Sequence, residues 1–259
     1  MSEVLQIDLN CDMGELPKAV ADGTQQALMR WVTSVNIACG GHAGDEDMMS
    51  LTIEQALRWK VAIGAHPGYT DRENFGRVEM KLSAGEVADS VYEQVVALAR
   101  IAERCGARVG HVKPHGALYN QAARDTEQAR AIATGVARWS REVVMVGLAG
   151  SRMLEAFREA GFLVAAEAFA DRRYEGDGSL RSRRFPDALI SEPEEAARQA
   201  LRMVREGTVM ASDGREVAVA AQTICIHGDG VGAAKIAEVV AVQLRGAGVN
   251  LAAVSCLRT

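Results

Sequence analysis

The sequence predicts an α/β fold in which seven or eight parallel strands and their helices form one TIM-like barrel. Short apolar runs alternate with longer helical patterns along the chain, as in repeated βα units. The chain has 259 residues, close to the ~250 typical of such barrels. Polar residues also gather where the apolar runs end, as they do at a barrel rim. We therefore expect one barrel domain spanning 1–259, with a doubly wound open sheet as the alternative.

Composition narrows the class of protein. Hydrophobic residues make up 48% and charged residues 24% of the chain, and the net charge of −5 favours neither nucleic acid nor an anionic membrane as partner. No apolar run approaches the ~20 residues of a membrane span, and the first residues show no leader pattern. The five cysteines are scattered without a C-x-x-C pair, which is typical of reduced thiols. We expect a cytoplasmic protein, compatible with a homo-oligomer, that acts on a small molecule.

The first half of the chain contains four expected strands, at 5–10, 34–38, 61–66 and 109–113. A short helix is expected at 25–31. Asp45 is a predicted N-cap for a helix reaching about residue 60, and Ser83-Ala84-Gly85-Glu86 is a capping-box signature for one reaching about residue 105. Pro114 should end the pairing of the fourth strand, and Gly116 allows a turn into the next helix.

The second half continues the alternation, with strands expected at 143–148, 162–168 and 223–227. Helices are expected at 125–139, after Gly150-Ser151, and after Gly228 to about residue 244. The segment 249–254 is the candidate for an eighth, closing strand.

Residues 169–222 break this rhythm, so we expect an insertion packed on the barrel. Ser191-Glu192-Pro193-Glu194 resembles another capping box, with proline in the first turn of a helix to about residue 205. The segments 208–211 and 216–219 flank Ser212-Asp213-Gly214 and should form a β-hairpin.

Strand periodicity predicts a polar interior at one end of the barrel. His111, Lys113 and His115 occupy alternate positions, which face the same side of an extended strand. Burying many ionisable groups is costly unless they pair or bind something, and a purely structural barrel would use Val, Ile and Leu there. We therefore expect a functional mouth. Its polar face comprises Asp8, Asn10, Asn36, His66, His111, Lys113, Glu167 and His227, and Ile7, Leu9, Val35, Ile37, Ile63, Val112, Val164, Ile224 and Ile226 face the helices.

Three chemistries fit this set. Asp12, His42 and His66 are the nearest candidates for a metal triad, but their spacing is not a compact ligand motif, and no tightly bound metal is predicted. Cys39 near His42 is a candidate nucleophile pair, although a buried, inert thiol is favoured. An acid/base set with Lys113 stabilising an oxyanion would suit the opening of an amide.

Two further features are interpreted as structural. Gly228-x-Gly230-x-x-Ala233 follows a strand and opens a helix, but it lies too near the C-terminus for a dinucleotide fold and is interpreted as a tight turn whose N–H groups can bind an anion. The sequence has no Gly-Lys pair and hence no Walker A loop. Arg172-Arg173 and 181–184 are interpreted as a solvated basic loop rather than an anion site.

Seven segments together resemble the LamB/YcsF family, over residues 5 to about 235. They are Asp8-Leu9-Asn10-Cys11-Asp12-Met13-Gly14-Glu15, Asn36-Ile37-Ala38-Cys39-Gly40, His42-Ala43-Gly44-Asp45, Gly64-Ala65-His66-Pro67-Gly68, Lys113-Pro114-His115-Gly116-Ala117-Leu118-Tyr119-Asn120, Glu167-Ala168-Phe169-Ala170-Asp171-Arg172 and His227-Gly228-Asp229. The chain departs from the family pattern at Gly41, Val78 and Gly230.

The resemblance implies a barrel related to polysaccharide deacetylases. It also implies ATP-dependent hydrolysis of 5-oxo-L-proline to L-glutamate, with ADP and phosphate formed, by an assembly with two further subunits, B and C. ATP, with Mg²⁺ as its counter-ion, would be bound by this chain or by those partners.

Within that reaction we expect Asp12 to act as base for water, His66 and His115 to carry protons, and Lys113 to stabilise the developing oxyanion or phosphate. Arg77 is the expected ligand of the substrate carboxylate. The expected substrate-binding set is Asp8, Asn10, Asn36, His42, Arg77, Tyr119, Glu167 and His227. Two alternatives stay open: a metal-dependent deacetylase or amidase acting alone, and a non-catalytic substrate-binding subunit.

Overall fold

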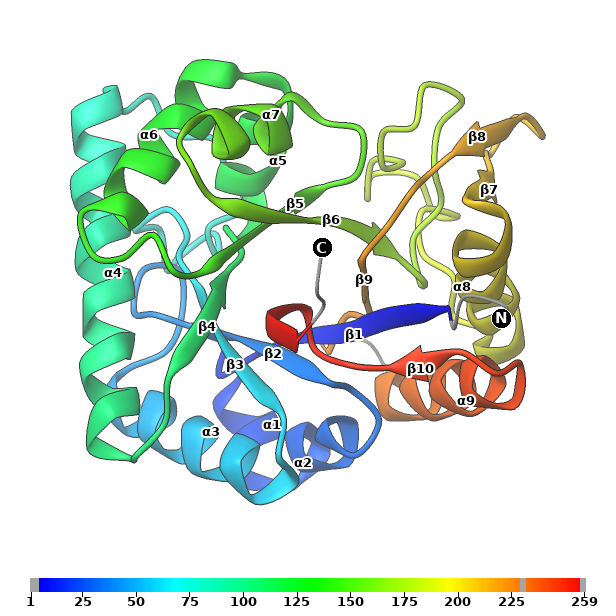
Figure 1. Cartoon of the computed structure of the whole chain (residues 1–259), viewed down its shortest axis with the longest axis horizontal. Helices are drawn as coiled ribbons and strands as arrows, with labels where there is room; N and C mark the ends of the chain where they lie inside the picture. Colours follow the sequence, from blue (N-terminus) through cyan, green and yellow to red (C-terminus); the bar gives the residue numbers. More distant parts are fainter. Residues whose placement is uncertain (1–4, 229–231, 257–259) are drawn as a thin grey trace.

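Seven parallel strands close into a barrel in the computed structural model, which describes residues 5–228 and 232–256 (Figure 1). The strands are β1 Gln6–Met13, β2 Ser34–Ala38, β3 Ala62–His66, β4 Val109–Val112, β5 Val144–Leu148, β6 Leu163–Phe169 and β9 Thr223–Cys225. Each pairs with the next, and β9 pairs with both β6 and β1, which completes the ring. The predicted TIM-like barrel is confirmed, and the open sheet is excluded.

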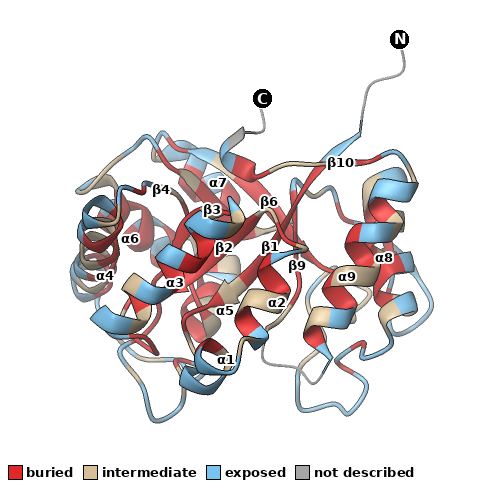
Figure 2. Ribbon diagram, turned by 90° about the horizontal axis from the view of Figure 1, so that it is seen from below, coloured by how far each residue is buried: buried red, intermediate tan, exposed pale blue. Residues whose placement is uncertain are grey.

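Helices surround the barrel, with their inner faces buried and their outer faces exposed (Figure 2). They are α1 Pro17–Ala21, α2 Thr24–Met29, α3 Glu46–Trp59, α4 Ala84–Arg104, α5 Gly116–Arg124, α6 Thr126–Ala137, α7 Arg152–Glu159, α8 Pro193–Glu206 and α9 Ala233–Gly246. The short helix α1 was not predicted. Among the described residues, no helix combines the length and apolarity that crossing a membrane requires.

Two predicted helix caps are confirmed and one is wrong. The Asp45 carboxylate accepts from the Met48 N–H at 2.8 Å, and Ser83 and Glu86 form a reciprocal capping box at the start of α4. The predicted box at Ser191 does not form, because α8 begins one residue later with Pro193 in its first turn and Glu192 as an N-cap without a side-chain bond. Proline fits the first helical position best, which leaves Ser191 outside the helix.

The predicted closing strand at 249–254 is not one of the seven strands that form the barrel. β10 (Asn250–Leu251) pairs in parallel with the first residues of β1, while β9 takes the place beside the rest of β1. The chain then crosses the opening of the ring as a 3₁₀ turn, Val254–Cys256 (red in Figure 1). Val254 packs with Val146 and Ala165 in a small core of its own. The C-terminal segment therefore plugs the barrel at the end opposite the predicted mouth.

The region after β6 is a helix and hairpin packed on the barrel, although β6 itself extends to Phe169. β7 (Thr208–Met210) and β8 (Glu216–Ala218) form the predicted antiparallel hairpin, and α8 packs against α9. Tyr174 and Met203 of this region belong to the same apolar core as the barrel strands. The Tyr174 hydroxyl accepts a hydrogen bond from the Phe169 N–H at 2.8 Å, which ties the segment to the end of β6.

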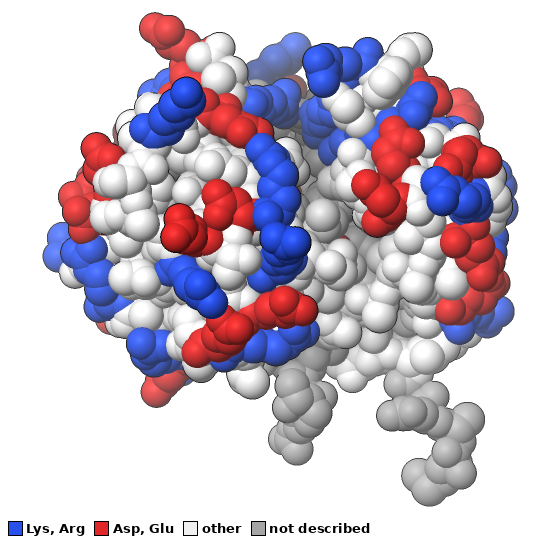
Figure 3. All heavy atoms as spheres, turned by 90° about the horizontal axis from the view of Figure 1, so that it is seen from above, with Lys and Arg blue, Asp and Glu red and all other residues white. Residues whose placement is uncertain are grey.

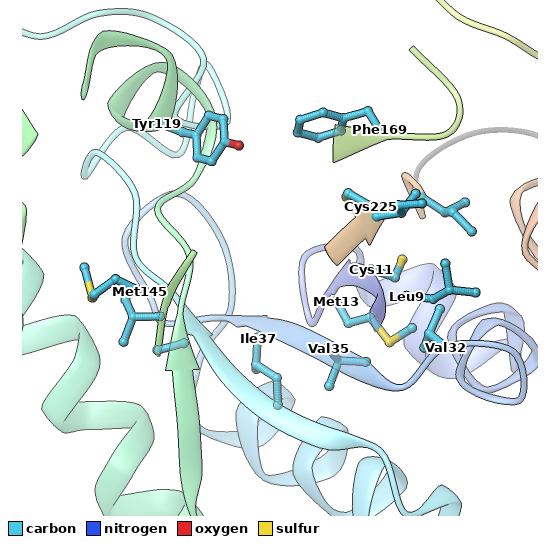
Figure 4. Close-up of a cluster of buried hydrophobic side chains, with 14 of the residues drawn as sticks. Leu9, Cys11, Met13, Val32, Val35, Ile37, Tyr119, Met145, Phe169 and Cys225 are labelled. Atoms are coloured by element: carbon cyan, nitrogen blue, oxygen red, sulfur yellow. The ribbon is translucent and has the colours of Figure 1, made fainter. Parts of the chain in front are cut away.

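Side chains alternate along the strands as the periodicity predicts. Leu9, Cys11 and Met13 lie along one face of β1 beside Val32, among the buried apolar residues (Figure 4). The intervening polar residues therefore face the barrel interior. A Cβ on Gly64 would lie 2.1 Å from the His111 Nε2, so only glycine at this position leaves room for the imidazole inside the ring.

Candidate active site

A cavity of about 760 Å³ lies at the C-terminal ends of the barrel strands and extends under the insertion. This volume falls in the range of small-molecule sites, about 300–1,000 Å³. Figure 3, a side view of the molecule, shows a hollow between two lobes, with Lys and Arg side chains along one edge. The predicted site residues that line the cavity are Asp12, His66, Arg77, Lys113, His115, Tyr119 and His227.

Five other predicted binding residues do not line the cavity. Asp8, Asn10, Asn36, His42 and Glu167 are each buried, at 0–2% exposure. In this position they support the residues that border the cavity, and their contact with substrate stays a prediction.

Lys113 lies at the centre of the cavity floor. Its Nζ is 3.0 Å from the Asp12 Oδ1 and 2.9 Å from the Glu167 Oε1, and it donates to the Cys225 Sγ at 3.2 Å. We call Asp12, Lys113 and Glu167 the lysine cluster. Burial alone would lower the pKa of Lys113, but Asp12, Cys225 and Glu167 raise it well above its ordinary value, so the amine is a cation. Burial likewise opposes ionisation of Asp12, yet His66 and Lys113 hold its pKa well below the usual range.

A layer of neutral groups beneath the lysine cluster fixes its orientation. Asn10 donates to the Glu167 Oε1 at 3.0 Å, and Asn36 donates to the Asp12 Oδ1 at 2.8 Å. The His111 Nε2 lies 3.0 Å from the Asn36 Oδ1, which can only accept, so this nitrogen carries the proton. Burial, with the charges of Lys113 and His66, lowers the pKa of His111 to about 3, and the ring is neutral.

Asp8 lies deeper still, as a buried carboxylate surrounded by hydroxyl groups. It accepts hydrogen bonds from Thr33, Ser34 and Thr223. Burial raises the pKa of Asp8 to about 6, since these three hydrogen bonds offset only part of the lost hydration.

The second half of the floor is a group of one carboxylate and three imidazoles, Glu15, His42, His66 and His115, which we call the histidine cluster. The Glu15 Oε1 is 2.9 Å from the His42 Nε2, 3.2 Å from the His115 Nδ1 and 3.7 Å from the His66 Nε2. The His66 Nε2 and the His115 Nδ1 are 3.0 Å apart, and the His42 and His115 rings stack with centroids 3.6 Å apart.

The pKa values of the groups in the histidine cluster are shifted in different directions. Burial opposes the charge on Glu15, but the adjacent His115 and His42 rings hold its pKa well below the usual range. Burial lowers the pKa of His42 to about 4. Burial also acts against protonation of His66, where the Asp12 carboxylate outweighs it and raises the pKa.

Glu15 is the main residue that the periodicity argument did not single out. It follows the end of β1 at Met13, beyond the alternation of the strand. The four ligand atoms of the histidine cluster lie within 4.8 Å of one another. Asp12 contacts one of the two other members of the predicted triad, His66, at 3.3 Å, whereas Glu15 contacts both His42 and His66 and takes the place of Asp12 as the metal-ligand candidate.

The loop between β3 and α4 covers the histidine cluster. Phe75 has a φ of +55°, which is uncommon for a residue with a side chain, and its carbonyl lies 2.9 Å from the His115 Nε2. Its ring contacts His42 and His115 edge-on. Arg72 ties the loop down by donating to the Gly40 carbonyl at 3.0 Å.

The departure at Gly41 also has a structural explanation, since a Cβ there would lie 2.3 Å from the Gln94 Oε1. Gln94 bonds both the N–H and the carbonyl of Gly68 in the same loop. Val78 is half exposed, and Gly230 lies outside the described residues.

Two aromatic side chains and a hydrogen-bonded His–Asp pair lie along the outer wall of the cavity. The rings of Tyr119 and Phe169 face each other edge-on, with centroids 6.3 Å apart (Figure 4). Burial and the nearby Glu167 raise the pKa of Tyr119 well above its ordinary value. His227 stacks on Phe169 and bonds through its Nδ1 to Asp171 at 2.9 Å, a partner that the periodicity argument did not single out.

Guanidinium groups line the outer cavity, from Arg77, Arg124, Arg172 and Arg183. The predicted solvated loop is wrong for Arg172, which is buried and has no hydrogen-bond partner at its Nε among the described residues. Arg181 fits that prediction better, because it pairs with Glu175 and Asp187 at the surface.

The candidate thiol nucleophile is inert. Burial raises the pKa of Cys39 to about 12, so no thiolate forms at neutral pH. Its sulfur accepts from the His66 N–H at 3.2 Å and makes no contact with the His42 ring that is described. The glycine turn after β9 lies partly outside the described residues.

Comparison with known proteins decides the family, since the model of the LamB/YcsF family matches residues 7–259. The chain belongs to the LamB/YcsF family. Within it, the chain is 49% identical to the A subunit of the 5-oxoprolinase of Chloroflexus aggregans, over 96% of this chain and 98% of the relative. The crystal structure of a lactam utilization protein from Thermus thermophilus is 45% identical, with a TM-score of 0.89 over 96% and 99% of the two chains.

The barrel also resembles that of a more distant enzyme. The peptidoglycan deacetylase PdaC from Bacillus subtilis matches with a TM-score of 0.50 and 15% identity, over 98% of this chain and 89% of that one. This likeness concerns the fold alone and confirms the predicted relation to polysaccharide-deacetylase barrels.

Proposed function

We propose that this chain is the A component of a 5-oxoprolinase that hydrolyses 5-oxo-L-proline to L-glutamate with concurrent hydrolysis of ATP, together with partner subunits B and C. Of two relatives that cover nearly the whole chain, one is named as the A component of a 5-oxoprolinase and the other as a lactam utilization protein. The observation that carries the chemistry is the lysine cluster at the cavity floor, where a buried cation lies between two carboxylates.

The proposed reaction adds water to the lactam carbonyl carbon and breaks the ring C–N bond, and the leaving nitrogen takes a proton. ATP supplies the activation by phosphorylating the amide oxygen, with ADP as the leaving group. Opening of the ring then leaves an acyl phosphate on the glutamate side chain, and a second water releases the phosphate. Asp12 is held ionised at the cavity wall and accepts the proton of the attacking water. Lys113 stabilises the negative charge that develops on the oxygen, because its ammonium is fixed and largely shielded from water.

His66 and His115 border the same cavity and form a path for the proton to the leaving nitrogen, with 3.0 Å between their facing ring nitrogens. Arg77 lies at the wall and suits the substrate carboxylate, since a guanidinium binds carboxylates through two parallel hydrogen bonds. Tyr119 and His227 shape the apolar side of the binding space.

The residues that line the outer cavity are suited to binding a phosphoryl group rather than a whole nucleotide. Arg172 is buried at the outer cavity with its Nε unpartnered among the described residues, and the guanidinium groups of Arg77, Arg124 and Arg183 line the same cavity. The chain has no Walker A loop. We therefore assign ATP and its Mg²⁺ to a site that subunits B and C complete, and self-association of the chain is compatible with this assembly.

One coupled assay tests the proposal: glutamate and phosphate release from 5-oxo-L-proline and ATP, with and without subunits B and C. Turnover should require all three proteins. Asp12→Asn in the assembled complex should lower turnover by at least ~10²-fold without lowering complex formation. Robust ATP-dependent turnover by the isolated chain contradicts the need for partners. Normal turnover with Asp12→Asn would instead favour a non-catalytic, substrate-binding subunit.

A second candidate is a metal-dependent amidase or deacetylase acting alone, which the histidine cluster favours. Imidazole and carboxylate donors of this kind hold zinc in hydrolases. Hydrolysis of lactams or acetamides by the isolated, metal-loaded chain without ATP would support this candidate over the first.

A further inference from the structure

The outward-facing nitrogens of two histidines settle which ring atoms carry protons. The His66 Nδ1 lies 2.7 Å from the Lys113 carbonyl, and the His115 Nε2 lies 2.9 Å from the Phe75 carbonyl. A carbonyl oxygen only accepts, so both of these nitrogens must donate. In a neutral ring the remaining nitrogen then presents a lone pair. The His66 Nε2 and the His115 Nδ1 therefore face each other as two acceptors, 3.0 Å apart.

Glu15 adds a third acceptor to the same small space. Its Oε1 is 3.2 Å from the His115 Nδ1 and 3.7 Å from the His66 Nε2, and it also reaches the His42 Nε2 at 2.9 Å. Buried lone pairs and a carboxylate that converge in this way repel one another unless a positive charge lies among them. That charge is either a proton on one ring or a metal ion.

The geometry favours the metal ion. A tetrahedral zinc site with bonds of 2.0–2.1 Å places neighbouring donor atoms about 3.3 Å apart. The contacts within the histidine cluster range from 2.9 to 3.7 Å, and all four donor atoms fit within 4.8 Å. One proton can satisfy one of these contacts, whereas one ion satisfies all four donors.

The surroundings of the cluster are also those of a metal centre. Histidine ligands usually donate their second ring N–H to a carbonyl or carboxylate, which fixes the tautomer, and His66 and His115 both do so. The strained Phe75 and its loop hold one of those carbonyls in place and shield His42 from solvent. The outer nitrogen of His42 has no partner among the described residues.

We propose that Glu15, His42, His66 and His115 bind one divalent transition-metal ion, with zinc the best match to three imidazoles and one carboxylate. Glu15, His66 and His115 line the cavity, so the ion would border the same space as the lysine cluster and place a second positive charge at its wall. The proposal does not depend on lactam hydrolysis, and it replaces the prediction from sequence that no metal is tightly bound. When the ion is bound, His66 and His115 are its ligands, so their proposed role as proton carriers belongs to the metal-free chain.

Metal binding by the full chain tests this directly. The purified protein is stripped with EDTA, checked for folding by circular dichroism and titrated with ZnCl₂ or CoCl₂. After desalting, elemental analysis should find one ion per chain. The melting temperature should rise with added Zn²⁺, because an ion that binds only the folded state stabilises it. The Co²⁺-loaded protein should show the visible absorption of a four-coordinate site.

Two ligand variants and one matched control locate the ion. Glu15→Gln and His115→Gln should each weaken Zn²⁺ binding at least ~10-fold, since even partners outside the ligand set typically contribute 10–100-fold. His111→Gln removes another buried imidazole of the barrel, outside the cluster, and should keep wild-type metal affinity and stoichiometry.

Two outcomes overturn the proposal. If the folded wild type retains neither Zn²⁺ nor Co²⁺ and neither ion moves its melting temperature, the cluster holds a proton instead. If Glu15→Gln and His115→Gln bind the ions as tightly as wild type, the ion lies elsewhere. The first measurement uses the wild type alone, so it decides the question even if a variant fails to fold.

Discussion

Lys113 and His115 are two residues apart in the chain, yet their side chains enter two differently balanced halves of one cavity floor. In the lysine cluster, a built-in cation lies within 3.0 Å of oxygens from two carboxylates. In the histidine cluster, a carboxylate and three imidazoles converge with no Lys or Arg among them. The first half contains its own cation as folded, whereas the second requires a positive charge from outside. The same rim can thus hold one fixed and one exchangeable cation.

Lys113→Ala should have the largest effect, because it removes the fixed cation and leaves two buried carboxylates facing each other. We expect the free energy of unfolding to fall by about 3–5 kcal/mol. Turnover of the assembled complex should fall by about 10²–10³. Lys113→Arg should not restore turnover, because a planar fork replaces a compact charge. A thermal melt beside the coupled assay separates the two effects. A much lower melting temperature with near-normal activity per folded molecule would reject the catalytic role and leave Lys113 purely structural.

Asp8 offers a contrast with Asp12 and Glu167, which both pair with Lys113. It is a buried carboxylate near the lysine cluster, and no cation is described beside it. Its pKa in the folded state is raised from 3.8 to about 6. The folded protein therefore binds the extra proton between these values, and stability falls as pH rises through this window. The loss should approach about 3 kcal/mol above pH 6. Urea unfolding of wild type and Asp8→Asn at pH 4 and pH 7 checks this. The variant should gain relative stability as pH rises, and a pH-independent difference would contradict the assigned burial cost.

Glu15→Gln removes the carboxylate of the histidine cluster, and its effect can be measured in the metal-free protein. The Glu15 carboxylate lies 2.9 Å from the His42 Nε2 and 3.2 Å from the His115 Nδ1, and hydrogen bonds to a charged partner typically contribute about 1.5–3 kcal/mol. We expect a loss of that size in the free energy of unfolding, measured by urea denaturation in EDTA. Glu79→Gln, at an exposed ion pair with Arg124, is the control and should change stability by less than about 1 kcal/mol. Equal effects of the two substitutions would mean that the cluster contributes little without its cation.

Cys39→Ala should have the smallest effect on turnover, although the Cys39 sulfur accepts a hydrogen bond from the His66 N–H. With its pKa raised to about 12, the thiol is neutral throughout the working range of the protein. Iodoacetamide should leave Cys39 unmodified in the folded chain, as peptide mass analysis can establish, and the variant should keep near wild-type turnover. Rapid alkylation of Cys39 that abolishes turnover would restore the nucleophile hypothesis.

Much of the fold was predictable, because the alternation of apolar residues indicated the strands and helices and the chain length matched that of a barrel. Period-two alternation in β1 and β4 assigned Asn10 and Lys113 to the interior, and the structure joins them across more than a hundred residues of sequence. Helix caps such as Asp45 were equally predictable, since each rests on a local hydrogen bond. At Ser191 the prediction failed because proline shifted the helix start.

The histidine cluster was less predictable because loops complete it. Glu15 comes after the last residue of β1, and the Phe75 carbonyl points at His115 only because that residue adopts a left-handed conformation. No repeating pattern of apolar and polar residues marks the position of Glu15 or the backbone conformation of Phe75. Arg172 shows the same limit, since a run of basic residues suggested solvent while the insertion folds back and buries it.

The position of β1 has a consequence for how the protein is made. β1 pairs with β9 on one side and with β10 on the other along its first residues, so its neighbours include strands that are synthesised after β2 to β6. Until about residue 225 has emerged, the growing chain presents the open edges of β1 and β6, which are ready templates for unwanted pairing. The ring, and with it the cavity, can close only after β9 has been synthesised. Substitutions that weaken β9 should therefore reduce the yield of folded protein more than its final stability.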